Sequence, residues 1–261
     1  MLAAWTRATL AEQLDRLGLA PSVDSLVHAS MRAVGWVDGG PAALLGALQD
    51  VLGPAATVVV PAQTTQYSTS STTHRAMTAG LDAAARRALL SALPPFDPAR
   101  TPSAGMGIFA EYVRTRPAAR RSAHPTSSFA ALGPAAEELT AVHPRECHLG
   151  ESSPLGALAR RGAQVLLLGV GFDKATAFHL AEYRLTPRRR VYYSKVHPAN
   201  TWEPYPGIVL DASDFAAIGA AMRDADWVRS GQVGAGVSVT FPMAPAVEFA
   251  RTWMLRMRVL I

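Results

Sequence analysis

The side chains best suited to chemistry lie in one short segment, Thr176-Ala-Phe-His179-Leu-Ala-Glu182. The apolar run 165–170 that precedes it is typical of a buried strand. If 175–184 forms a helix, His179 and Glu182 are three residues apart and lie on one face. A carboxylate beside an imidazole fixes its tautomer and stabilises the imidazolium that forms when the ring takes a proton. The segment therefore predicts a general base with an orienting partner, while a structural His–Glu ion pair is the alternative.

The elements around this segment predict its place in the fold. A strand, a glycine-containing turn and a helix put it at the carboxyl edge of a sheet, where open α/β sheets carry their ligands. Earlier in the chain, 25–30 and 57–61 are predicted strands. The predicted helix between them, 41–52, begins at a proline and ends before a glycine. This strand–helix–strand order predicts an α/β fold with at least some parallel pairing.

The other predicted elements follow from apolar periodicity. Helices are expected over 7–18, 105–115, 134–142, 154–161 and 213–223, and strands near 164–169, 191–196 and 226–239. The hydroxyl-rich stretch 62–80 is predicted to be a long polar loop, and such loops are usually functional or disordered. Three prolines and a glycine in 197–207 predict a break in regular structure. Because no internal repeat is evident, we expect a single domain over 1–261 that carries this loop.

Composition and charge exclude several classes of protein. Of 261 residues, 49% are hydrophobic and 17% are charged, which indicates a globular chain with a sizeable core. No apolar run is long enough to span a bilayer, and the first residues do not form a signal-peptide pattern. The single cysteine, Cys147, fits a reducing compartment, and the net charge of +5 comes from scattered arginines. We therefore expect a soluble cytoplasmic protein without a nucleic-acid or membrane partner.

Other motifs with chemical potential are incomplete. Residues 167–171 suggest a dinucleotide-binding turn, but Lys174 stands where the third glycine is needed. His143, Cys147 and His148 lack the second half of a zinc-site pattern. No base can be assigned to Cys147, and the chain has no Gly-x-Ser-x-Gly nucleophile motif. We therefore predict neither a metal site nor a covalent nucleophile.

Six segments, in order along the chain, carry a family pattern. They are His28 to Gly40, Pro95 to Pro98, Thr101 to Gly107, Arg121 to Ser128, Gly150 to Leu155 and Thr176 to Glu182. Together they resemble the aminoglycoside 3-N-acetyltransferases, the antibiotic N-acetyltransferase family, and the resemblance runs from about residue 7 to 255. It implies an α/β fold with a mixed central sheet flanked by helices, distinct from the common acetyltransferase fold. It also implies acetyl-CoA as cosubstrate, without a metal.

The resemblance also implies roles for individual residues. His179 and Glu182 match the catalytic histidine and glutamate, and Thr176 is implied near the acetyl group or in the turn. The residues implied in CoA binding are His28, Ala29, Ser30, Met31, Val34 and Gly35 for the pantetheine and phosphates, Ser103, Met106 and Gly107 for the same channel, and Ser122 and His124 at the thioester end. The candidates for the acceptor site are Tyr67, Glu151 and Asp173.

The expected reaction is direct acetyl transfer to an amine, with His179 taking the proton that the amine loses. The family points to the 3-amino group of a 2-deoxystreptamine aminoglycoside, and so to antibiotic resistance. Aminoglycosides are polycations, yet 62–80, an expected acceptor wall, contains no Asp or Glu. Two alternatives therefore stay open: the same chemistry on another amine, such as a secondary-metabolite intermediate, or CoA binding without turnover. Either a monomer or a homodimer is compatible with these expectations.

Overall fold

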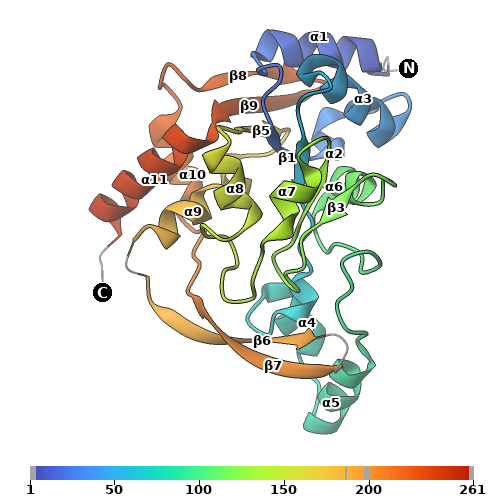
Figure 1. Ribbon diagram of the computed structural model, residues 1–261, viewed down its shortest axis with the longest axis vertical. Helices are drawn as coiled ribbons and strands as arrows, with labels where there is room; N and C mark the ends of the chain where they lie inside the picture. Colours follow the sequence, from blue (N-terminus) through green and yellow to red (C-terminus); the bar gives the residue numbers. More distant parts are fainter. Residues whose placement is uncertain (1–3, 186, 197–199, 259–261) are drawn as a thin grey trace.

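A seven-stranded mixed sheet, in the order β3-β4-β2-β1-β5-β9-β8, forms the centre of the protein (Figure 1). The computed structural model describes residues 4–185, 187–196 and 200–258. The strands of this sheet are β1 (Ser25–Ala29), β2 (Val58–Pro61), β3 (Arg120–Arg121), β4 (Phe129–Leu132), β5 (Gln164–Leu168), β8 (Arg229–Val233) and β9 (Gly236–Pro242). β2, β1 and β5 run parallel, and their outer neighbours β4 and β9 pair antiparallel. The carboxyl ends of the three parallel strands therefore meet at one edge.

Two hydrophobic cores, one on each face of the sheet, hold the helices in place. Leu26 and Val165 belong to one core, and Val27 and Leu166 to the other, as the two-residue period of a strand requires. The helices of the first core are α7 (Ala136–Ala141), α8 (Pro154–Arg160), α9 (Phe178–Tyr183), α10 (Phe215–Met222) and α11 (Met243–Met257). Those of the second core are α1 (Arg7–Leu17), α2 (Met31–Val34), α3 (Gly40–Leu52) and α6 (Gly107–Arg114). The predicted mixed sheet flanked by helices is confirmed.

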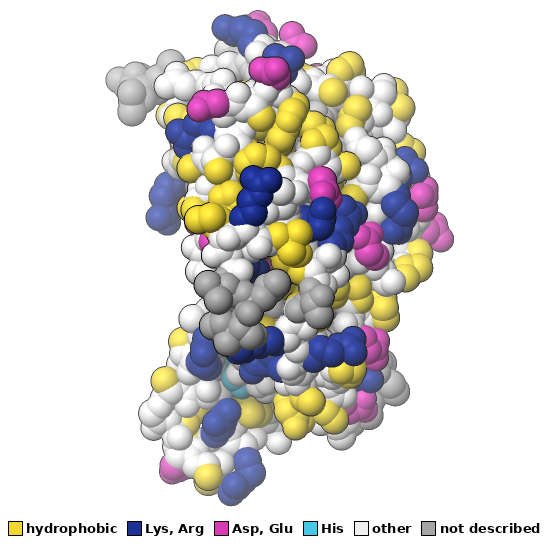
Figure 2. All heavy atoms as spheres, turned by 90° about the vertical axis from the view of Figure 1, so that its left-hand side faces the viewer, with side chains coloured by type: hydrophobic (Ala, Val, Ile, Leu, Met, Phe, Trp, Pro, Cys, Tyr) yellow, Lys and Arg dark blue, Asp and Glu magenta, His cyan; other side chains and the backbone are white. Residues whose placement is uncertain are grey.

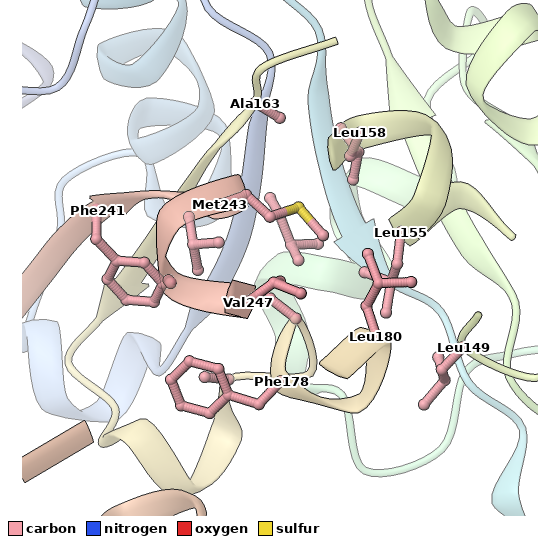
Figure 3. Close-up of a cluster of buried hydrophobic side chains, with 14 of the residues drawn as sticks. Leu149, Leu155, Leu158, Ala163, Phe178, Leu180, Phe241, Met243 and Val247 are labelled. Carbon is pink, nitrogen blue, oxygen red and sulfur yellow. The ribbon is translucent and has the colours of Figure 1, made fainter. Parts of the chain in front are cut away.

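Helix α9, which carries the segment of chemical interest, is anchored by the first core. Phe178 and Leu180 of α9 lie in the same cluster as Met243 and Val247 of α11 (Figure 3). All four side chains are fully buried, and such burial stabilises by about 1.5–3 kcal/mol for each side chain. The backbone around His179 is therefore fixed beside the end of β5.

A separate two-stranded sheet lies at the end of the molecule away from α1 (Figure 1). Its antiparallel strands are β6 (Arg189–Val196) and β7 (Thr201–Ile208), and α5 (Ala83–Ala92) lies nearby. Lys195 of β6 is 1% exposed and donates hydrogen bonds to the carbonyls of Leu90 and Ser91 at 3.1 and 2.8 Å. Because the last carbonyls of a helix lack internal partners, this ammonium ties the sheet to the end of α5.

The segment 62–80, predicted to be a long loop, is polar but partly helical. It holds the 3-10 turn η1 (Thr65–Tyr67) and the helix α4 (Thr72–Thr78). The Oγ of Ser71 accepts a hydrogen bond from the His74 N–H at 3.0 Å and caps α4. The buried His74 ring packs edge-on against Trp202 of β7, with 5.7 Å between ring centroids. A local cap and a contact distant in sequence thus order part of this polar segment.

Two further predictions are corrected by the structure. The prolines of 197–207 predict a break in regular structure, and residues 197–199 of this stretch lie outside the described part. β7 nevertheless continues through Pro204 and Pro206. These prolines are two residues apart, so both face the unpaired edge of a two-stranded sheet, where no N–H donor is needed. The predicted strand 226–239 is instead the hairpin of β8 and β9, because Gly234, with φ of +63°, begins a two-residue turn. The sequence reasoning also misses α5 and α11.

Basic side chains are dispersed over the upper part of one face of the molecule. On the face shown in Figure 2, Lys and Arg are interleaved with acidic and hydrophobic side chains over the upper part of the molecule.

None of the helices within the described residues has both the length and the apolarity needed to cross a membrane.

Candidate active site

A cavity of about 600 Å³ opens at the carboxyl edge of the parallel strands. Its wall includes residues at or just beyond the ends of these strands, namely His28 and Ala29 of β1, Pro61 of β2, and Val170 after β5. The start of α6 contributes Gly107, α9 contributes His179, and α10 contributes Phe215. The chemically promising segment therefore lies at the edge where open α/β sheets carry ligands.

His179 and Glu182 form a hydrogen-bonded pair at this wall. Nδ1 of His179 lies 2.5 Å from Oε2 of Glu182, one turn further along α9. In a neutral ring, the Nδ1–H donates to the carboxylate and leaves Nε2 unprotonated. The His179 side chain is 13% exposed, and the ring of Phe215 packs on it with 4.6 Å between centroids. This arrangement suits a base, because one nitrogen is held and the other is available at the cavity.

Both oxygens of the buried Glu182 carboxylate have partners. Oε1 accepts hydrogen bonds from the Asp211 N–H at 2.9 Å and from Nη1 of Arg258 at 2.6 Å. Burial disfavours the charged form of Arg258, but its hydrogen bonds to Asp214 and Glu182 outweigh burial and raise the guanidinium pKa. Arg258 is therefore a permanent positive charge next to Glu182 of the His179–Glu182 pair. The carboxylate is not left as an uncompensated charge in the interior.

His28 and Thr176 occupy the same wall. Nε2 of His28 lies 3.2 Å from Oγ1 of Thr176. Burial lowers the pKa of His28 to about 4, so the ring is neutral at physiological pH. The Thr176 carbonyl accepts the His179 N–H at 3.1 Å. Thr176 thus joins the end of β1 to the turn that leads into α9.

The charged side chains of the cavity wall are mostly basic. Arg32 and Lys174 line the wall, and Asp173 is its one carboxylate among the residues that the structure describes. Nζ of Lys174 lies 2.8 Å from Oδ2 of Asp173, so this carboxylate already has a counter-ion. A wall of this charge is better matched to an anionic ligand, such as a phosphate, than to a polycation.

Most residues assigned to CoA binding lie on this wall. These are His28, Ala29, Ser30, Met31, Met106 and Gly107. Val34, however, is buried in the second core, and Gly35 ends α2 with φ of +91°. Oγ of Ser103 donates to Oε2 of Glu111 at 2.7 Å, which holds Ser103 to α6. Val34, Gly35 and Ser103 therefore support the wall instead of lining it.

Ser122 and His124 belong to a buried cluster with His143 and His148. The His124 ring lies 4.6 Å from that of His143 and 4.8 Å from that of His148, between centroids. The Ser122 Oγ–H donates to Nδ1 of His143 at 2.8 Å, and the same oxygen accepts the Phe129 N–H at 3.0 Å. The cavity wall includes neither Ser122 nor His124. The structure thus places them in a hydrogen-bond network that joins two loops.

The imidazoles of this cluster are neutral. Nδ1 of His124 accepts the Ser127 N–H at 3.0 Å, while its Nε2–H donates to the Arg145 carbonyl at 3.1 Å. Burial is the main cause that lowers the pKa of His124 well below its ordinary value, and it lowers those of His143 and His148 to about 4. Within the described ranges, no group of three or more His, Cys, Asp or Glu side chains is arranged to hold a metal ion.

The three candidate acceptor residues lie in different places. Asp173 is on the wall, as described above. Tyr67 is buried and packs edge-on against Phe96 at 6.5 Å between centroids, and burial raises its pKa. Glu151 forms ion pairs with Arg184 at 2.7 Å and Arg160 at 3.8 Å. The structure therefore brings only Asp173, of these three, to the cavity.

Several functional candidates are not found by reasoning from the sequence. On the wall they are Arg32, Gln63, Lys174 and Phe215. Arg32 and Lys174 lie inside or beside segments that carry the family pattern, so their position in the sequence could have indicated that they line the cavity. Arg258 is 76 residues from Glu182 along the chain, and no local pattern connects the two.

The chain is similar to known proteins over nearly its whole length. The family model described as aminoglycoside 3-N-acetyltransferase matches residues 26–255. The SPbeta prophage-derived aminoglycoside N(3')-acetyltransferase-like protein YokD of Bacillus subtilis (strain 168) is 33% identical over 254 residues, which cover 96% of this chain and 92% of that protein. Aminoglycoside N(3)-acetyltransferase VII of Streptomyces paromomycinus is 36% identical over 268 residues, which cover 95% and 91%.

Solved structures show the same similarity. The crystal structure of YokD from Bacillus subtilis matches with a TM-score of 0.91 at 32% identity, covering 98% of this chain and 96% of that one. The binary structure of AAC-IIIb with CoASH matches with a TM-score of 0.83 at 31% identity, covering 97% of each chain.

Proposed function

The chain belongs to the aminoglycoside 3-N-acetyltransferase family, and on this basis we propose that it transfers the acetyl group of acetyl-CoA to an amine, with His179 as the general base. One observation carries the proposal. Nδ1 of His179 is bound to Glu182 at 2.5 Å, and the ring lies on the cavity wall with its second nitrogen available.

The proposed step is direct nucleophilic substitution at the thioester. The amine nitrogen forms a bond to the acetyl carbon, the carbon–sulfur bond breaks, and CoA leaves as a thiolate. Nε2 of His179 takes the proton that the amine loses, and Glu182 stabilises the imidazolium so formed. The proton on His179 is then available to the departing thiolate. A positioned base of this kind contributes about 10²–10⁴-fold to the rate.

The surroundings of Cys147 favour direct transfer over a covalent acetyl-enzyme. Cys147 is absent from the residues that line the cavity. Burial raises the pKa of its thiol, which reduces the fraction of reactive thiolate at neutral pH. His179 therefore has the amine as its proton donor, without an intervening thiol nucleophile.

The basic part of the wall suits the phosphates of CoA. Arg32 and Lys174 supply positive charge, and Gly107, at the start of α6, lines the same cavity, where the N-terminus of a helix favours a negative charge. The relative AAC-IIIb binds CoASH, which supports the same site here. His28 to Met31, at the end of β1, would then lie along the cosubstrate.

Two classes of acceptor fit the family chemistry. The first is the 3-amino group of a 2-deoxystreptamine aminoglycoside, which the family name and the curated relatives favour. The second is an amine of lower charge. The basic wall favours it, because Asp173 is already paired with Lys174 and a polycation normally needs several carboxylates.

A thiol-release assay with acetyl-CoA separates these candidates. The panel contains 2-deoxystreptamine aminoglycosides, simple primary amines, and amines that also carry a carboxylate. Release with the antibiotics supports the first class, and release only with the other amines supports the second. Saturable CoA binding without release from any amine would contradict the proposed activity.

A further inference from the structure

The buried carboxylate of Glu182 is held from two sides. Oε2 faces Nδ1 of His179 at 2.5 Å, and Oε1 accepts a hydrogen bond from Nη1 of Arg258 at 2.6 Å. The Asp211 N–H adds a further hydrogen bond to Oε1 at 2.9 Å. Because both oxygens are engaged, the carboxylate is restricted to the orientation in which Oε2 meets the imidazole.

Arg258 is itself fixed by a second carboxylate. Its Nε and Nη2 donate to the two oxygens of Asp214 at 2.6 and 2.7 Å, a bidentate contact. Nη2 also donates to the Asp211 carbonyl at 2.7 Å. Arg258 directly follows α11, and Asp214 directly precedes α10. The guanidinium therefore connects the ends of two helices to the carboxylate on α9.

We infer that Arg258 is a positioning residue for acetyl transfer: it holds the Glu182 carboxylate in its orientation, so that His179 presents Nε2 to the cavity, and Asp214 acts through Arg258. This inference rests on the proposed function, because it assigns a task to the same His179–Glu182 pair. It makes the end of α11 part of the active-site assembly, in addition to its place in the core.

Arg258 also determines the charge that the imidazole meets. Without it, Glu182 would face His179 as a stronger negative charge, and the imidazolium would form more readily. Among the residues that the structure describes, the other charged or titratable groups around the pair include Asp211, Asp214, His148 and Tyr192. A neutral residue at 258 removes the cation that is bound to Glu182. The protonated, inactive form of the base would therefore persist to higher pH.

A purely structural role for Arg258 predicts a different result. Arg258 clamps α11 to the start of α10, so its loss is expected to lower stability under either interpretation. A loss of stability alone reduces the folded fraction and leaves the pH profile of the remaining active molecules unchanged. The pH profile therefore distinguishes positioning from folding.

The test compares Arg258→Met with a matched control, Arg251→Met. Arg251 lies on α11 itself, but it pairs with Glu248 at 2.7 Å, and that Glu248 side chain is 55% exposed. For Arg258→Met we expect kcat to fall about 10- to 100-fold with little change in KM for acetyl-CoA, since small displacements of a catalytic group cost up to about 10²-fold. We also expect the acidic limb of the kcat profile to move to higher pH. Arg251→Met is expected to match the wild type in both respects.

A conservative variant and a measurement without turnover complete the test. Arg258→Lys keeps the charge but not the bidentate contact, so it is expected to restore the acidic limb and recover only part of kcat. Wild-type kcat in Arg258→Met overturns the inference, as does a lower kcat with an unmoved profile. NMR titration of the His179 ring makes the same comparison without an acceptor, and an unmoved titration curve also overturns it. If the wild type releases no thiol with any amine, the proposed function fails instead.

Discussion

His179 at the cavity and a set of three buried histidines have opposite surroundings in this protein. His179 has one ring nitrogen held by Glu182 and lies on the wall of the cavity. His124, His143 and His148 pack against one another in the interior, with 4.6 and 4.8 Å between neighbouring centroids. The comparison teaches that a ring nitrogen held by a carboxylate beside a ligand space distinguishes His179 from the more densely packed buried imidazoles.

The hydrogen-bond partners explain the difference between the two sets. Both nitrogens of His124 and of His143 are engaged by backbone or hydroxyl groups. Proton uptake there would break a hydrogen bond and place a charge in the interior. At the cavity, Glu182 supplies the counter-charge that a protonated His179 needs. The buried histidines are therefore suited to remaining neutral, whereas His179 has a carboxylate beside it.

The largest expected effect is on turnover. His179→Ala removes the proposed base and is expected to lower kcat by about 10²–10⁴-fold. Affinity for CoA is expected to be largely kept, because the basic part of the wall is unchanged. Steady-state thiol release and calorimetric titration with CoA measure the two quantities. Wild-type turnover in this variant would remove the chemical distinction between the two sets.

Acidification is expected to act mainly on the buried set. Burial lowers the pKa of His143 and His148 from 6.5 to about 4. Between these values the unfolded chain binds protons that the folded chain does not, so the free energy of unfolding falls as pH drops below about 6.5 and levels off near 4. At about pH 5 the loss is about 2 kcal/mol for each buried histidine.

Urea denaturation at about pH 7.5 and about pH 5 measures this effect. His28, whose pKa burial also lowers to about 4, is expected to contribute in the same direction. A free energy of unfolding that stays constant over this range would contradict neutral, buried imidazoles.

A smaller effect is expected from removing one hydroxyl of the buried set. Ser122→Ala leaves Nδ1 of His143 and the Phe129 N–H without their partner, which is expected to destabilise the fold by about 1–3 kcal/mol. Turnover per folded molecule is expected to stay at the wild-type level. Denaturation together with active-site titration by CoA checks this. Lost turnover at unchanged stability would instead place Ser122 with the thioester, as the family resemblance implies.

The smallest effect is expected at the surface. Glu151→Gln weakens exposed ion pairs with Arg184 and Arg160, and such pairs contribute about 0–1 kcal/mol. Stability, kcat and the KM for the acceptor are all expected to stay near wild type. A clearly raised acceptor KM would show that the acceptor site extends beyond the cavity to Glu151.

The pair of His179 and Glu182 at the cavity could be predicted from the sequence because its contact is local. His179 and Glu182 are three residues apart, and a strand and a turn place them at the ligand edge. The small residues at the end of β1, which follow His28, are also recognisable as a pattern in the sequence. In both cases strand polarity and helix periodicity, which leave clear traces in a sequence, determine the position.

The remaining features depend on contacts between distant segments. Arg258 reaches Glu182 across 76 residues, and His143 meets Ser122 across 21. No periodicity links such residues, so neither the contact of Arg258 with Glu182 nor that of Ser122 with His143 could be predicted from the sequence. Pro204 illustrates a related limit of prediction from sequence. A proline breaks a strand only if its nitrogen faces the paired edge of that strand, and which edge is paired is a tertiary property.

The central claim is that Glu182 acts in turnover through His179, and a double-variant cycle of kcat tests it most directly. Glu182→Gln alone is expected to lower kcat strongly. In the His179→Ala background the same substitution is expected to change kcat little, because residues that act as one unit are non-additive. Losses that multiply fully in the double variant would contradict the account.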